Sequence, residues 1–119
     1  MQPEKPETAD LRASMKANGL TQINFFDGQL IGFARKKDGG DFVSLEVSVD
    51  FKRMKVSATT IRESADKNSM NRFKEVDYKE AGWRTHDEAS QLIGKYCRVL
   101  PRSKRLDVAA TMRGHAYHF

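Results

Sequence analysis

Basic and aromatic side chains are the residues of this chain whose types most clearly suggest a chemistry. A cationic groove with rings on which bases stack is the usual means of holding single-stranded DNA or RNA. Lys and Arg release counterions from phosphates, so such binding is salt-sensitive and weakly sequence-specific. The side chains that we predict to form a nucleic-acid site are Arg35, Lys36, Lys37, Phe42, Arg53, Lys55, Tyr96, Arg98, Arg102, Lys104, Arg105 and Arg113.

The positive charge is concentrated in the second half of the chain. The 119 residues have a net charge of +5. Residues 51–119 hold fifteen Lys and Arg against eight Asp and Glu, a net charge of +7. This asymmetry favours a polyanionic partner, and the alternative is a basic surface that only aids solubility.

The aromatic residues divide into expected stacking platforms and expected core. Phe42 falls on the polar parity of a predicted strand, so we expect Phe42, and also Tyr96, to be exposed. Phe33 and Trp83 are expected in the core more than on a platform, because large aromatic side chains dominate cores. Tyr117 is a further stacking candidate.

A metal centre is the weaker interpretation of the histidines. His115 and His118 have i, i+3 spacing, which could chelate a metal on a helix, and His86 and Cys97 are further possible ligands. On an extended segment the two imidazoles point in opposite directions, and no Cys or carboxylate cluster supports them. We expect no metal and no cofactor.

Catalysis has little support in the sequence. Cys97 lies on the apolar parity of a predicted strand, as a small buried hydrophobe does. The chain has no Gly-x-Ser-x-Gly, Walker-type or dinucleotide-binding motif, and the acidic pair Asp87-Glu88 is explained by helix capping. We therefore expect a protein that is not an enzyme.

The strongest structural signal is the stretch 42–51. Val43, Leu45, Val47, Val49 and Phe51 fall on one parity, and polar residues fill most of the other. Side chains alternate across a strand, so this pattern predicts a strand with one buried and one solvated face, which is typical of antiparallel sheets.

The remaining pattern supplies the other expected elements. Thr8 is the expected cap of the first helix, and Thr85 with Glu88 has the spacing of a capping box. Thr60 and Glu63 have the same spacing, and residues 60–82 are expected to be a mobile insertion with some helix. In chain order we predict a loose leader 1–8, a helix over 9–17, a strand over 20–35 bent at Gly28 or Gly32, a hairpin loop 36–41, the strand 42–51, a strand over 54–59, a helix from 85 to 94 or 95, and strands over 96–100 and 106–113.

This order predicts one α+β domain over residues 1–119, mainly antiparallel. Three meandering strands, a helical region and a final hairpin are the element order of a five-stranded OB-like barrel or strongly curved sheet. One short helix precedes the sheet, and one or two helices lie between the third and fourth strands. A bent first strand is what closing a small barrel requires.

A protein-binding module is the alternative function. The small single domain, an exposed Phe42 and an aromatic tail also fit an adaptor or inhibitor from a phage or mobile element. A second copy could pair with an edge strand to give a homo-oligomer. The single Cys97, the lack of a signal-peptide apolar region and the lack of an 18-residue apolar run predict a cytoplasmic protein without a membrane span.

Overall fold

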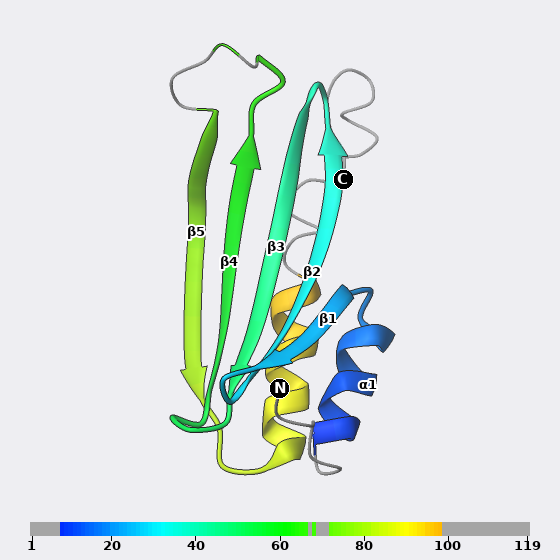
Figure 1. The fold of residues 1–119 in the computed structure, drawn as a ribbon, viewed down its shortest axis with the longest axis vertical. Helices are drawn as coiled ribbons and strands as arrows, with labels where there is room; N and C mark the ends of the chain where they lie inside the picture. The colour runs from blue at the N-terminus through cyan, green and yellow to red at the C-terminus, as the bar shows by residue number, and fades with distance from the viewer. Residues whose placement is uncertain (1–7, 67, 69–71, 99–119) are drawn as a thin grey trace.

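The computed structural model describes residues 8–66, 68 and 72–98. The strands form one sheet in the order β1-β2-β3-β4-β5, each antiparallel to its neighbour in sequence. Helix α1 and a second helix over residues 86–98 pack on the same face (Figure 1). The labelled elements are α1 (Ala9–Ala17), β1 (Thr21–Phe26), β2 (Gln29–Asp38), β3 (Asp41–Asp50), β4 (Lys55–Glu63) and β5 (Phe73–Gly82).

Strand β3 lies at the centre of the sheet, as its alternating pattern predicts. Val43, Leu45, Val47 and Val49 are at most 3% exposed and face the helices. The predicted strands over 42–51 and 54–59 imply a short turn between them, which is confirmed, since β3 pairs with β4 from Asp50 to Phe42. These four side chains of β3 therefore form the central part of the buried face of the sheet.

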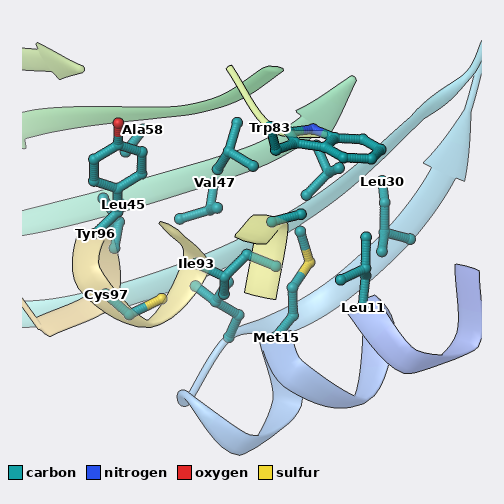
Figure 2. Packing of buried hydrophobic residues seen from close by; sticks show 14 of the residues in the cluster. Leu11, Met15, Leu30, Leu45, Val47, Ala58, Trp83, Ile93, Tyr96 and Cys97 are labelled. Carbon is teal, nitrogen blue, oxygen red and sulfur yellow. The ribbon is translucent and has the colours of Figure 1, made fainter. Parts of the chain in front are cut away.

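Helix α1 covers the β1–β2 side of this buried face. Its Leu11 and Met15 are fully buried, and Figure 2 shows both pointing into the cluster with Leu30. Gly32 of β2 lies beneath the helix, where an added Cβ would stand 3.1 Å from Met15 Sδ and 3.1 Å from Leu20 Cβ. The missing side chain at Gly32 lets α1 approach the sheet.

The second helix begins with the predicted capping box. The Thr85 hydroxyl accepts the backbone N–H of Glu88 at 3.1 Å, and the Glu88 carboxylate accepts that of Thr85 at 3.1 Å. Ile93 is fully buried against the core. The helix passes through Gly94, where we predicted its end, and continues over residues 96–98, so a strand there is wrong.

An aromatic cluster joins the end of the sheet to the second helix. The Phe51 ring contacts Phe25, Trp83 and His86 edge-on, with centroids 6.2, 5.7 and 6.0 Å apart. Trp83 is 7% exposed, which confirms its expected place in the core. These contacts bring together β1, the β3–β4 turn and the start of the helix.

The two helices also contact each other directly. The Ser14 and Ser90 hydroxyls are 2.8 Å apart, and His86 Nδ1 lies 3.0 Å from the Asp10 carboxylate. Each pair is separated by 76 residues along the chain. The layer above the sheet is therefore completed only when both helices are present.

The expected barrel is wrong, because the sheet is open and β1 and β5 are its two edges. The predicted bent strand over 20–35 is two strands joined at Asp27 and Gly28, whose φ angles are 52° and 75°. This tight reversal sends β2 back along β1, so no continuous strand curls the sheet.

The expected helical insertion over 60–82 is also wrong where it is described. Strand β4 continues to Glu63, and β5 occupies the end of the region. The spacing of Thr60 and Glu63 belongs to a strand and not to a helix cap. The second helix consequently follows the fifth strand, and no helix lies between the third and fourth. The predicted strand 106–113 and the leader residues 1–7 lie outside the described residues.

Candidate functional site

The face of the sheet opposite the helices is not covered by any described element. We call it the open face. Alternate residues of each strand from β2 to β5 point to this face, and the strand register places them side by side. Its members are Gln29, Ile31, Phe33, Arg35, Lys37, Phe42, Ser44, Glu46, Ser48, Asp50, Lys55, Ser57, Thr59, Ile61, Glu63, Phe73, Glu75, Tyr78 and Glu80.

The charge on the open face is more negative than the sequence suggested. Its cations are Arg35, Lys37 and Lys55, whereas its acids are Glu46, Asp50, Glu63, Glu75 and Glu80. These strand charges sum to −2, or to −1 with Arg72, which precedes β5 and lies over Phe73. The register of four strands, and not the composition of any one strand, produces this balance.

Arginines cover two of the aromatic rings at the β2–β3 hairpin end of this face. The Arg35 guanidinium carbon lies 3.9 Å from the centroid of the Phe42 ring, and that of Arg72 lies 5.2 Å from the centroid of Phe73. Both guanidinium groups also contact Glu63, at 2.9 Å from Arg35 and 2.8 Å from Arg72. Phe42 is therefore half-buried beneath a cation.

Hydrogen bonds hold several acids of the open face in the ionised form. The Arg72 and Arg35 guanidinium groups lower the pKa of Glu63. The Lys55 ammonium and the Tyr78 hydroxyl lower the pKa of Glu80, and this carboxylate raises the pKa of Tyr78 in return. The carboxylates of Glu63 and Glu80 therefore already have hydrogen-bond donors within the protein.

Two acids of the open face have no such partner within the described residues. Glu46 lies between Phe33 and Thr59 at the centre of the face, and Glu75 lies beside Ile61 on β5. No ion pair joins either carboxylate to a described cation. These two carboxylates therefore place negative charge without an ion pair beside Phe33 and Ile61.

The predicted nucleic-acid residues do not gather on one surface. Arg35, Lys37, Phe42 and Lys55 lie on the open face, but Lys36 has the opposite parity and points to the helix side. Arg53 lies in the β3–β4 turn, with Nε 3.3 Å from the Asp50 carboxylate.

The nucleic-acid residues predicted from Tyr96 onward do not join the open face either, where the structure describes them. Tyr96 was expected to be exposed, which is wrong: it is 5% exposed in the helix–sheet core, where burial raises the pKa of its hydroxyl. Arg98 lies on the second helix beside Asn18 and Gly94, on the helix side of the sheet. Arg102, Lys104, Arg105 and Arg113 lie outside the described residues.

Both edges of the sheet are irregular, which bears on the predicted edge pairing. The β1–β2 register shifts between Thr21 and Asn24, and the β4–β5 register shifts at Thr60 and Ile61. Irregularities at an edge twist it away from a second strand, and charged side chains on β5 add to this protection. Homo-oligomerisation through an edge stays a prediction that these features disfavour.

A hollow at one corner of the open face combines cations that the sequence placed apart. It has a volume of about 440 Å³ and lies where β4 begins and β5 ends. Arg84, which we did not predict, joins the predicted Arg53 and Lys55 there. Only the pairing of Lys55 with Gly82 across the strands brings them together, so no pattern in the sequence could have identified the group.

Within the described residues, no three His, Cys, Asp or Glu side chains lie together as metal ligands. No described helix is long and apolar enough to cross a bilayer. Comparison with protein families, with curated proteins and with solved structures finds no match to this chain.

Proposed function

We propose that this protein is a non-catalytic binding protein whose open face docks a protein partner bearing apolar and basic side chains. The observation that carries the proposal is the composition of that face. Phe33 and Ile61 lie opposite the two acids that have no ion pair. Toward the β2–β3 hairpin, Arg35 and Arg72 lie over the rings of Phe42 and Phe73. Aromatic residues and Arg are the types enriched in protein interfaces and their hot spots.

The sign of the charge favours a protein over a nucleic acid. Of the three open-face cations, Arg35 and Lys55 already contact carboxylates, at 2.9 and 2.7 Å. A phosphate backbone laid along the strands would meet five acids and only one cation without a described ion pair, Lys37. Single-stranded nucleic-acid binding, the first expectation from the sequence, therefore becomes the competing outcome of the test.

The two acids without ion pairs define what the partner must offer. Glu46 and Glu75 carry charge that a Lys or Arg side chain would neutralise. Phe33 and Ile61 lie half-buried beside them and gain from being covered by apolar atoms. A second copy docked face to face would oppose acid to acid, so a different protein is the better fit.

The size of the face is adequate for specific docking. Strands up to ten residues long, at about 3.3 Å per residue and about 4.8 Å apart, give roughly 600 Å² over β2 to β5. A standard interface buries about 800 Å² on each partner. The open face with its margins approaches this value.

Affinity capture with matched variants tests the proposal. The wild type, the open-face variant Phe33→Ser with Glu46→Lys, and the control Lys95→Glu on the exposed side of the second helix are immobilised equally. Proteins captured by the wild type and the control but lost on the open-face variant are then purified and titrated. In parallel, binding of fluorescent oligo(dT) is followed at low and moderate salt.

We expect a purified partner to bind the wild type and the control equally, and the open-face variant at least about tenfold more weakly. Salt-sensitive oligo(dT) binding that Arg53→Glu with Lys55→Glu abolishes would instead support the nucleic-acid function. Capture that is the same for all three proteins would reject the open face as the docking surface. Circular dichroism establishes that each variant is folded.

A further inference from the structure

The corner hollow is a separate structural feature with its own chemistry. Lys55 and Gly82 face each other across β4 and β5, and the backbone N–H of Trp83 donates to the backbone carbonyl of Met54 at 2.9 Å. This bond fixes the two walls relative to each other. The hollow is lined by Arg53, Met54, Lys55, Gly82, Trp83, Arg84 and Glu88.

Three cations line the hollow against a single acid. The Glu88 carboxylate accepts the backbone N–H groups of Arg84 and Thr85, at 2.7 and 3.1 Å, so it is committed to capping the helix. The Arg84 guanidinium makes no hydrogen bond or ion pair within the described residues. The Arg53 guanidinium contacts Asp50 through Nε alone, and the side chain is 75% exposed. Guanidinium N–H groups of both arginines are available to a ligand.

The helix that begins beside the hollow also favours negative charge in this place. The second helix begins here, and a helix N-terminus carries a partial positive charge. Trp83, which forms part of the wall, is 7% exposed, and its Nε1 is buried without a hydrogen-bond partner.

We infer that the corner hollow binds a small anionic ligand through a phosphate or carboxylate group held by Arg53 and Arg84. Guanidinium forks match the paired oxygens of both groups. The volume of about 440 Å³ lies within the range of small-molecule sites and admits a ligand of mononucleotide size. Met54 and Trp83 supply the apolar wall against which an uncharged part of the ligand packs.

Trp83 supplies the measurement, because it is the only tryptophan in the chain. Its fluorescence is followed at constant ionic strength while inorganic phosphate, acetate, AMP or adenosine is added. We expect saturable changes with AMP and with at least one simple anion, and none with adenosine. Phosphate binding without acetate binding assigns the site to phosphate, whereas acetate binding at equal affinity assigns it to carboxylates generally.

Matched variants assign the binding to this hollow. Arg53→Gln and Arg84→Gln should each weaken it at least about tenfold, since each removes a charged donor. Lys95→Gln, a cation on the exposed side of the second helix, should leave it unchanged. Chemical shifts of the Trp83 indole N–H and the Arg Nε–H groups give a second readout that does not depend on fluorescence.

Three results would overturn the inference: adenosine binding as tightly as AMP, no saturable response to any anion by either readout, or equal weakening by Lys95→Gln. Lys55 belongs both to the open face and to the lining of the hollow, whereas Arg84 lines the hollow alone, so the Arg84→Gln result tests the anion site without altering the open face. Conversely, failure to find a protein partner leaves the anion titration intact.

Discussion

The Arg35 guanidinium carbon lies 3.9 Å from the centroid of the Phe42 ring, so a residue of the chain itself occupies the surface that a base would stack on. The same guanidinium reaches Glu63 at 2.9 Å. The Phe42 ring thus lies beneath the ion pair of Arg35 with Glu63. This geometry favours a flat protein surface over a single-strand platform.

The contact of Arg35 with Phe42 should be measurable as a coupling energy. A double-mutant cycle with Arg35→Ala and Phe42→Ala should give about 0.5–1 kcal/mol, the range of a cation–π pair at an exposed site. Urea denaturation of the four proteins gives the value. Strict additivity of the two single changes would show that the ring and the cation do not interact in solution.

Removing Arg62 should destabilise the β2–β3 hairpin strongly. The carboxylate of Asp38, only 6% exposed, accepts from Arg62 at 2.6 Å. Arg62→Met leaves that charge buried without a partner, at a cost of about 3 kcal/mol in unfolding free energy.

Two variants control for the lost charge and for the change of residue. Asp38→Asn together with Arg62→Met should recover part of the loss, because no charge is then left buried. Lys74→Met, on the neighbouring strand and without an ion pair within the described residues, should change the unfolding free energy by less than about 0.5 kcal/mol. An effect of Arg62→Met no larger than that of Lys74→Met would contradict the buried pairing.

Adding one methyl group at Gly32 should loosen α1. The new Cβ would stand 3.1 Å from Leu20 Cβ and from Met15 Sδ, so Gly32→Ala should cost about 1–3 kcal/mol in unfolding free energy. Gly82→Ala is the matched control, because its nearest neighbour is the Met54 carbonyl oxygen at 3.7 Å. Thermal and urea unfolding compare the two, and equal stability would mean that α1 does not pack on Gly32.

Acid should lower the folding stability of the protein through three carboxyl groups of the open face. Hydrogen bonds lower the folded-state pKa of Glu63 and Glu80. For Asp50, burial acts to raise the pKa, but the backbone N–H groups of Arg53 and Lys52 together with the Arg53 guanidinium outweigh it, so the pKa is lowered. A carboxyl whose pKa is lower in the folded state stabilises the protein above its unfolded pKa, roughly 4. That stabilisation is lost as pH falls from there through the folded values.

Urea midpoints between pH 6 and pH 3 measure this loss. The variant Glu63→Gln with Glu80→Gln should show a shallower decline than the wild type, because its two amides do not titrate. A decline equally steep in both proteins would assign the acid sensitivity to other groups.

Local periodicity predicted the parts of the fold that depend on near neighbours. The alternation in β3, the apolar pair Leu11 and Met15, and the capping box of Thr85 with Glu88 are all confirmed. Each is set by residues within a turn or a strand. These signals were sufficient for an antiparallel sheet with one buried face.

Long-range pairing accounts for the failures. The charge balance of the open face depends on which β5 residue lies opposite each β4 residue, and a register shift at Thr60 and Ile61 changes this. Tyr96 was assigned to a strand, because Gly94 suggested the end of the helix. Tertiary packing of Ile93 and Cys97 against the sheet carries the helix past that glycine.

The contacts of Ser14 with Ser90 and of Asp10 with His86 also have a consequence for biosynthesis. The hairpins can form one after another as the nascent chain emerges, but residues 86–98 are translated last among the elements described. Until then, the buried side chains of β3 lack the cover of this helix. The growing polypeptide therefore exposes apolar side chains of β3 until residues 86–98 have left the ribosome.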